Sequence, residues 1–173
     1  MQPISKTPAI SVLMSVFNSD KYLHEAIDSI LKQTFTDFEF IIINDASTDS
    51  SVNIIKSYND IRIVLIENET NIGLTNSLNK GIKRATGKYI ARMDADDIAL
   101  PFRFAEQFSF MELHAEIGIC GTWVETFNEK GKIVVWDYPE THEKIICRQF
   151  FNVGFAHPTV MFRVMVPLST FIR

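Results

Sequence analysis

Four apolar runs alternate with amphipathic helical segments between residues 10 and 93, and this alternation limits the possible folds more than any other feature. The apolar runs are 10–16, 38–43, 61–66 and 89–93. Apolar residues recur at helical spacing over 22–33 and 74–85, and again in a segment that Ser47 or Thr48 can cap. Strands that alternate with helices form parallel sheets with right-handed crossovers. The sequence therefore predicts an α/β fold with a Rossmann-like, mostly parallel sheet flanked by helices.

After residue 93 the predicted segments become shorter and their order changes. In chain order they are a helix at 101–114, a strand at 117–124, a hairpin turn at 129–132, a strand at 133–136, a helix near 140–151 and a strand near 159–162. Pro101 favours the start of the first of these helices, and the hairpin favours antiparallel pairing. We therefore expect a smaller antiparallel part towards the C-terminus. Without a repeat, a linker or a low-complexity tract, residues 1–173 are expected to form a single domain.

Composition excludes several classes of function. The chain has 173 residues, 46% hydrophobic and 22% charged, which is typical of a globular domain. Its net charge of −4 provides no basic field, so nucleic acid is not an expected partner. Cys120 and Cys147 have neither metal nor redox spacing, which indicates reduced thiols and a cytoplasmic location. No run approaches the roughly 18 apolar residues of a membrane helix, so we expect no transmembrane segment; peripheral membrane association stays open.

Three acids directly follow the strand predicted at 89–93: Asp94, Asp96 and Asp97. Open α/β sheets bind ligands at the carboxyl ends of their strands. Two acids spaced one residue apart can present oxygen atoms to one divalent cation, which prefers carboxylate and water ligands. In the alternative interpretation, Asp96 and Asp97 only cap the next helix or complement its dipole. This segment alone does not decide between a metal site and a helix start.

A second acid, Asp45, follows the predicted strand at 38–43. In a parallel sheet it faces the same crevice as the acids after residue 93, which suits a ligand with a base or sugar at one end and a metal-bound phosphate at the other. Neither a Gly-x-Gly-x-x-Gly segment after the first strand nor a P-loop sequence occurs. A Rossmann dehydrogenase and a P-loop nucleotidase are thus disfavoured, and phosphates would be held mainly through a metal.

Five segments, in order, resemble sequences of family 2 glycosyltransferases, a large GT-A group that uses nucleotide sugars. They are residues 10–18, 38–49, 71–74, 87–97 and 157–163. The most specific is 87–97, Gly-Lys-Tyr-Ile-Ala-Arg-Met-Asp-Ala-Asp-Asp, which is close to the family's Gly-x-Tyr-Ile-x-x-Leu-Asp-Ala-Asp-Asp. The resemblance runs from about residue 9 to 163 and implies a GT-A fold.

The resemblance also implies roles for single residues in the nucleotide site. The nucleotide-sugar-binding candidates are Ser15, Val16, Phe17, Asn18, Asp45, Asn71, Gly73, Arg92 and Asp94. Asp45 would accept a hydrogen bond from the base, and an acid there suits a ring N–H such as that of uracil; otherwise Asp45 is a turn residue before the next helix.

For the metal and phosphate end, the resemblance implies that Asp94 faces the ribose or the metal and that Asp96 ligates Mn²⁺ or Mg²⁺. Asp97 would be structural. Arg92 would approach phosphate or form an ion pair with a neighbouring acid. His157 would lie near the acceptor or be an ordinary loop histidine.

The chain departs from the family pattern at several positions. Ser15 and Phe17 replace the usual Pro and Tyr, Asn44 replaces the first of two acids, and Ala46 replaces Gly. A larger departure concerns the catalytic base, which the family carries in a later acidic motif, usually Glu-Asp. No Glu-Asp pair occurs here and no acid follows Glu143. We therefore expect no catalytic base within residues 1–173 and interpret the chain as a GT-A domain truncated at its C-terminus.

The function implied by the resemblance is transfer of a sugar from a nucleotide-sugar donor, UDP-linked, to a glycan or lipid-linked acceptor, with inversion and with a divalent metal. The first alternative is a nucleotide-sugar-binding fragment that lacks the base and does not catalyse transfer. The second is a phosphotransfer domain of receiver or phosphatase type. Such domains place a key acid after the first strand, where this chain has Phe17 and Asn18.

Overall fold

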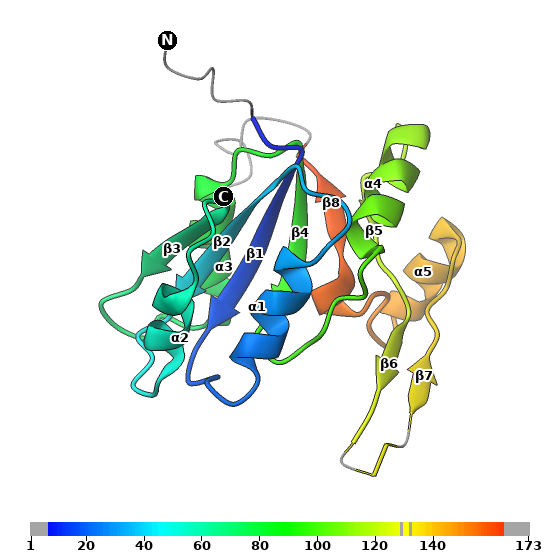
Figure 1. Ribbon diagram of the computed structural model, residues 1–173. Helices are drawn as coiled ribbons and strands as arrows, with labels where there is room; N and C mark the ends of the chain where they lie inside the picture. The colour runs from blue at the N-terminus through cyan, green and yellow to red at the C-terminus, as the bar shows by residue number, and fades with distance from the viewer. Residues whose placement is uncertain (1–6, 129, 132, 165–173) are drawn as a thin grey trace.

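The computed structural model describes residues 7–128, 130–131 and 133–164. Its main sheet has six strands in the order β3-β2-β1-β4-β8-β5. They are β1 (Ile10–Val16), β2 (Phe38–Asn44), β3 (Ile63–Glu67), β4 (Tyr89–Asp94), β5 (Ile119–Cys120) and β8 (Met161–Arg163). The first four strands are parallel, and β8 runs antiparallel to both β4 and β5. The predicted mostly parallel sheet is thus confirmed (Figure 1).

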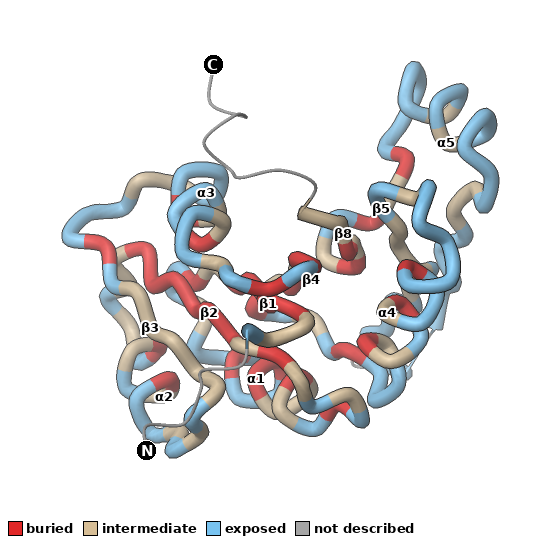
Figure 2. The backbone as a smooth tube through the Cα atoms, turned by 90° about the horizontal axis from the view of Figure 1, so that it is seen from above, coloured by how far each residue is buried: buried red, intermediate tan, exposed pale blue. Residues whose placement is uncertain are grey.

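Helices cover both faces of this sheet. They are α1 (Leu23–Leu31), α2 (Ser51–Ser57), α3 (Leu74–Arg84), α4 (Arg103–Leu113) and α5 (His142–Gln149). Helices α1, α2 and α4 bury their apolar side chains in the larger core on one face, and α3 packs against a smaller core on the other. Figure 2 shows the buried backbone of β1, β2 and β4 between these layers, with α5 largely exposed at one side. The parallel strands are apolar on both faces because both are covered.

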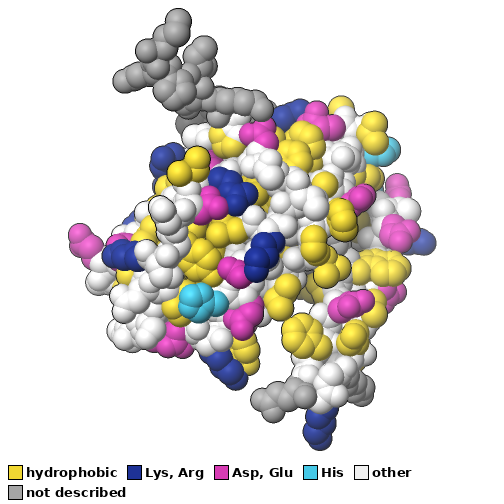
Figure 3. All heavy atoms as spheres, viewed as in Figure 1, with side chains coloured by type: hydrophobic (Ala, Val, Ile, Leu, Met, Phe, Trp, Pro, Cys, Tyr) yellow, Lys and Arg dark blue, Asp and Glu magenta, His cyan; other side chains and the backbone are white. Residues whose placement is uncertain are grey.

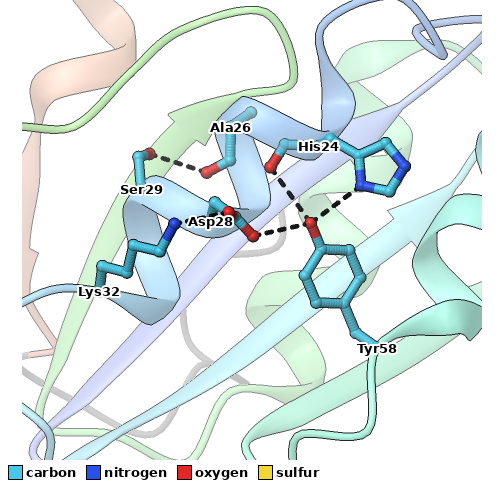
Figure 4. A network of polar contacts seen from close by, with 6 residues as sticks. All are labelled: His24, Ala26, Asp28, Ser29, Lys32 and Tyr58. Atoms are coloured by element: carbon cyan, nitrogen blue, oxygen red, sulfur yellow. Dashed lines mark hydrogen bonds and ion pairs between the residues drawn. The ribbon is translucent and has the colours of Figure 1, made fainter.

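A polar network joins α1 to the end of α2 on the outer surface (Figure 4). The hydroxyl oxygen of Tyr58 lies 2.9 Å from Asp28 Oδ1 and 3.2 Å from His24 Nδ1. Lys32 Nζ pairs with the other carboxylate oxygen of Asp28 at 2.7 Å. Burial and the adjacent Asp28 carboxylate raise the pKa of Tyr58 well above its ordinary value. The network holds together the two helices whose preceding loops form part of the strand-end edge described below.

The strand predicted at 117–124 is wrong as a single element. It is divided between β5 in the main sheet and β6 (Val124–Thr126), which pairs antiparallel with β7 (Val134–Trp136) in a separate two-stranded sheet. Between them the Thr122 N–H donates to Thr159 Oγ1 at 3.0 Å, and a Cβ on Gly121 would lie 2.9 Å from the Phe155 ring. These contacts redirect the chain. The antiparallel pairing of β6 and β7 confirms the predicted hairpin, although Glu129 and Lys132 of its turn lie outside the described residues.

Element boundaries also differ from those predicted. Helix α4 begins at Arg103, because Pro101 lies in a turn whose carbonyl accepts from the Thr34 N–H at 2.9 Å. The last strand begins at Met161, because residues His157–Thr159 form a 3-10 helix, η1. Ile61, predicted to start the third strand, is fully exposed, and β3 begins at Ile63. The short C-terminal helix is α5, within the predicted 140–151.

Candidate functional site at the carboxyl ends of the strands

The carboxyl ends of β1, β2 and β4 lie side by side at one edge of the sheet. Val16 pairs with Asn44 across β1 and β2, and Ser15 pairs with Asp94 across β1 and β4. The chain leaves β1 towards β2 and β3 and later returns to β4 on the opposite side of β1. Such a switch in direction opens a crevice where doubly wound sheets bind ligands. The residues predicted for the ends of the first, second and fourth strands therefore meet here.

The residues that close β1 contribute different groups to this edge. Ser15 is half-buried and Val16 is fully buried, whereas Phe17 and Asn18 are exposed. The backbone carbonyl of Val16 accepts a hydrogen bond from the Asp45 N–H at 2.8 Å. Only the side chains of Ser15, Phe17 and Asn18 are thus open to a ligand, and Val16 serves through its backbone.

Asn18 joins the loop after β1 to the loop after β2. Its N–H donates to Ser47 Oγ at 3.1 Å, and its Oδ1 accepts from the Thr48 N–H at 2.8 Å. Ser47 and Thr48 are therefore engaged here and do not cap α2, which begins at Ser51. Asn18 and Ala46 have left-handed φ values of 49° and 59°. Asn tolerates this region, but an alanine there is strained, and Ala46 is the position where the family pattern has glycine.

Asp45 is 2% exposed, and its carboxylate is occupied by donors from the protein. Oδ1 accepts from Asn68 Nδ2 at 2.8 Å and from the Ile72 N–H at 2.9 Å, and Oδ2 accepts from the Gly73 N–H at 2.8 Å. Burial raises the pKa of Asp45, but the hydrogen bonds of Ile72, Asn68, Ser77 and Gly73 outweigh burial and hold that pKa below its ordinary value. Asp45 is thus an ionised anchor for the turn before α3.

The turn anchored by Asp45 contains two further predicted residues. Asn71 is exposed, and its Oδ1 accepts from the Gly73 N–H at 3.1 Å. Gly73 has φ +84°, and nothing lies within 4 Å of the position that a Cβ would take. The glycine is therefore required for its backbone conformation and not for space. Asn71 and Gly73 are brought to the same edge as Asp45.

Arg92 and Asp94 form an ion pair on β4. Arg92 Nη2 lies 2.7 Å from Asp94 Oδ1. Burial raises the pKa of Asp94; Arg92 and His157 lower it, and Asp96 raises it. Within the part of the chain that the structure describes, Nε and Nη1 of Arg92 are buried without a hydrogen-bond partner. The ion-pair interpretation of Arg92 is observed, and its approach to phosphate stays a prediction.

The acids after β4 repel one another. Asp96 is exposed and Asp97 is half-buried. Burial raises the pKa of Asp97, and the charges of Asp94 and Asp96 raise it further, against the opposing charges of Arg103 and Arg92. A divalent cation would relieve this repulsion. Within residues 7–128, 130–131 and 133–164, no three His, Cys, Asp or Glu gather to hold a metal ion. A cation at these acids would therefore have to take most of its ligands from outside the described residues.

Two residues behind these acids were missed by the sequence analysis: Arg103 and Gln107. Both lie on α4, and Gln107 is 4% exposed. Gln107 occupies the same helix face as the buried Phe104 and Met111, at spacings of three and four residues. The sequence signal that indicates a role for Gln107 is its position as a polar residue on an apolar helix face, because a buried polar group needs a hydrogen-bond partner.

A cavity of about 790 Å³ lies elsewhere, between α4, β5 and α5. Its walls include Phe110, Trp123, Tyr138 and Ile146. None of the predicted nucleotide-sugar or metal residues lines it. The predicted strand-end residues thus lie apart from this cavity.

The fold, with acids at the ends of its parallel strands, defines a GT-A type domain. Residues 11–167 match the family described as Glycosyl transferase family 2, and the chain belongs to this family. The resemblance found in the sequence is thereby confirmed.

Curated relatives from bacteria and archaea match most of the chain. An uncharacterized glycosyltransferase of Methanocaldococcus jannaschii is 43% identical over 160 residues, covering 89% of this chain and 55% of that protein. The O-antigen biosynthesis glycosyltransferase WbnJ of Escherichia coli is 39% identical over 167 residues, covering 92% of this chain and 63% of that protein. The chain thus spans about half to two thirds of the length of these relatives.

Solved structures share the fold. Staphylococcus aureus TarS 1–349 in complex with UDP-GlcNAc superposes with a TM-score of 0.72 at 25% identity, covering 89% of this chain and 45% of that one. The mannosyltransferase PcManGT of Pyrobaculum calidifontis, in complex with GDP-Man and Mn²⁺, has a TM-score of 0.63 at 19% identity, covering 92% of this chain and 45% of that one. Among the described residues of the present chain, no helix is long and apolar enough to cross a membrane.

Proposed function

We propose that this chain is the donor-binding part of an enzyme that transfers a sugar from a nucleotide sugar, UDP-linked, to a glycan or lipid-linked acceptor, with inversion and with Mn²⁺ or Mg²⁺. The observation that carries the proposal is the meeting of three strand ends at the switch point, where Ser15 pairs with Asp94 beside the loop of Asp45. Nucleotide ligands of doubly wound sheets bind at this position.

The similar proteins support the donor class. TarS was solved with UDP-GlcNAc, and a domain of the same fold was solved with GDP-Man and Mn²⁺. Relatives are described as acting in O-antigen and amylovoran biosynthesis. These descriptions support a nucleotide-sugar donor and a polysaccharide product for this chain. We also propose a cytoplasmic location; Cys120 and Cys147 are both free thiols.

In the proposed complex, each element at the edge recognises one part of the donor. The exposed ring of Phe17 offers an apolar face to the base, and Ser15 and Asn18 offer hydrogen-bonding groups. Asp45 would accept a hydrogen bond from the base N–H in addition to those from the Asn68, Ile72 and Gly73 groups that hold its carboxylate. Asn71 and Gly73 lie at the same edge, beside Asp45.

Asp94 and Asp96 would hold the divalent cation at the diphosphate. A cation bound there would neutralise the negative charge that develops on the departing diphosphate. Arg92 holds Asp94 in place through the ion pair, and its positive charge favours a phosphate group nearby. The general base for the acceptor hydroxyl is proposed to lie outside residues 1–173, because Asp45, Asp94 and Asp96 already serve other roles.

Calorimetry with UDP tests the proposal. We expect UDP to bind with Mn²⁺ present and binding to be lost with EDTA, because the edge provides acids and no glycine-rich phosphate loop. Asp96→Asn should weaken Mn²⁺-dependent binding, whereas Asp137→Asn, at an exposed acid beyond β7, should leave it unchanged. Equal affinity in Mn²⁺ and EDTA would remove the metal from the proposal, and no binding of UDP or UDP-GlcNAc in either condition would overturn it.

A further inference from the structure

Behind the acids of β4, side chains and backbone groups form a closed ring of hydrogen bonds. Arg103 Nη2 donates to the Arg92 carbonyl at 2.8 Å, and Arg103 Nε donates to Gln107 Oε1 at 3.1 Å. Gln107 Nε2 donates to the Thr159 carbonyl at 2.8 Å. The ring closes because the next carbonyl, that of Val160, accepts from the Arg92 N–H at 2.9 Å.

This ring joins two segments that lie far apart in sequence. One is the end of β4, which leads directly into Asp94. The other is residues 157–160, with η1 and the exposed His157, whose charge acts on Asp94. The β4–β8 pairing ends at Ala91, and one further backbone hydrogen bond, from the Arg92 N–H to the Val160 carbonyl, continues it. Beside this bond, the α4 side chains of Arg103 and Gln107 link the Arg92 and Thr159 carbonyls.

Arg103 differs from Arg92 in its charge environment. Burial lowers its pKa to about 10, and the charge of Asp97 opposes this effect. No carboxylate of the described residues lies within ion-pair distance of it. The guanidinium of Arg103 is half-buried and donates to a backbone carbonyl, an amide and the Met93 sulfur. Removing a cation from water without an ion-pair partner costs free energy, so these hydrogen bonds must offset that cost.

We propose that Arg103 and Gln107 are positioning residues for the metal-bound donor, holding the acids after β4 in register with the segment 157–160. The proposal rests on the proposed function, since it assigns a role towards the same strand-end site. Neither side chain touches the donor. They act through the Arg92 and Thr159 carbonyls, in the way that outer-shell partners orient the ligands of a metal.

Two substitutions break the ring at different bonds. Arg103→Lys keeps the positive charge but cannot span Arg92 and Gln107 together, because an ammonium lacks the planar fork of a guanidinium. Gln107→Glu can still accept from Arg103 but loses the donor to Thr159. A third substitution, Gln107→Met, has a side chain of similar volume and removes both hydrogen bonds of Gln107. It replaces either of the first two variants if that variant fails to fold.

Arg62→Lys provides a matched control at the other edge of the sheet. Arg62 donates to the Leu31 carbonyl at 3.1 Å and to Asp60 at 3.0 Å, so it is also an arginine that holds a backbone carbonyl. It lies just before β3, at the amino ends of the parallel strands, away from the acids. A loss of stability alone should affect the control and the ring variants alike.

The experiment measures the dissociation constant of UDP at saturating Mn²⁺, and the paramagnetic resonance spectrum of the bound Mn²⁺, below the melting temperature of every variant. We expect Arg103→Lys and Gln107→Glu to weaken binding roughly tenfold or more and to alter the spectrum. Arg62→Lys should stay within about twofold of wild type with an unchanged spectrum. Folded ring variants with wild-type affinity and spectrum would overturn the positioning role, as would an equal loss in the control. Failure of wild type to bind UDP would instead overturn the proposed function.

Discussion

Residues 10–113 and residues 119–153 of this chain are built in different ways. In the first region, six of the seven residues of β1 and of β2 are buried, and α1 contributes four buried side chains. In the second region, α5 has no buried residue and all three residues of β7 are exposed. Figure 3 shows hydrophobic side chains gathered on the side that carries β6, β7 and α5.

The difference shows where the strand-end site gets its rigidity. Every predicted donor residue lies in the first region, either on strands whose two faces are covered by helices or in the loops that follow these strands. A two-stranded sheet such as β6–β7 is marginally stable by itself. Apart from the contacts with residues 157–160, the support of the site thus lies within the first region, and substitutions in the second should leave both the fold and the site largely unchanged.

The largest expected contrast comes from deleting one aromatic ring in each region. Phe40 on β2 is fully buried, whereas Phe151, after α5, is 88% exposed. We expect Phe40→Ala to lower the free energy of unfolding by about 3–5 kcal/mol through lost burial and the cavity left behind. Phe151→Ala should change it by about 0.5 kcal/mol or less. Urea unfolding followed by circular dichroism measures both, and similar losses at the two positions would contradict the comparison.

A second contrast uses two glycines, Gly87 in the first region and Gly118 just before the second. A Cβ on Gly87 would lie 2.6 Å from the Ser11 backbone nitrogen and 2.8 Å from the Ile10 carbonyl carbon, whereas a Cβ on Gly118 would meet nothing within 4 Å. Gly87→Ala should therefore destabilise the fold by about 2–3 kcal/mol, because backbone must move. Gly118→Ala should be nearly neutral. Thermal unfolding of the pair tests this, and a stable Gly87→Ala protein would show that β1 and β4 can separate.

Asp45→Asn tests the anchor of the turn before α3. The new amide cannot accept from the Ile72 and Gly73 N–H groups and from Asn68 as the carboxylate does, so we expect a loss of about 1–3 kcal/mol of stability. UDP affinity, measured separately, should fall by about 1.5–3 kcal/mol if Asp45 also receives the base N–H. Unchanged affinity in a folded variant would limit Asp45 to the turn.

The stability difference between wild type and Asp45→Asn should depend on pH. The folded-state pKa of Asp45 lies below the unfolded value of about 3.9, so its stabilisation is present above that value and is lost as pH falls through the folded pKa. The stability difference between wild type and Asp45→Asn should thus be constant near neutral pH and shrink below about pH 4. Urea midpoints across this range measure it. A difference that does not shrink would show that the charge of Asp45 contributes nothing.

The smallest expected effect is a gain in stability, from a substitution of Ala46. Ala46 has φ 59°, where an L side chain is disfavoured by about 1 kcal/mol or more. Ala46→Gly should therefore raise the stability by about 1 kcal/mol, less the extra chain entropy of glycine. A melting temperature that rises confirms the strain, and one that falls would mean that neighbouring contacts of the Ala46 methyl group outweigh it.

The first region was predictable from sequence because its signals are local. Five of the seven residues of Phe38–Asn44 are Phe or Ile, and such a run indicates a buried strand without reference to any distant segment. Asp45 and the acids Asp94 and Asp96 could be placed at one edge by topology alone, and the turn 71–73 only through the family resemblance. The role of Asp45 in holding the turn 71–73 could not be predicted, because the donors to its carboxylate come from backbone groups more than twenty residues away.

The second region resisted prediction because its structure depends on distant partners. The division of 117–124 into β5 and β6 follows from Thr159 and Phe155, about forty residues later. Likewise, Gln107 could be noticed as polar on an apolar face, but its contact with the Thr159 carbonyl spans 52 residues. Periodicity reports which face of an element is buried and not which segment covers it.

The place of β8 in the sheet has a consequence for how the chain is made. Tyr89 pairs with Arg163 and Ala91 with Met161, so the β8 side of β4 is filled by a segment synthesised about seventy residues later. During translation, β1 to β4 can assemble while that edge of β4 is still open, and unpaired strand edges promote association between chains. We expect nascent chains that end between α4 and β8 to depend on chaperones, and this dependence to cease once Arg163 has emerged from the ribosome.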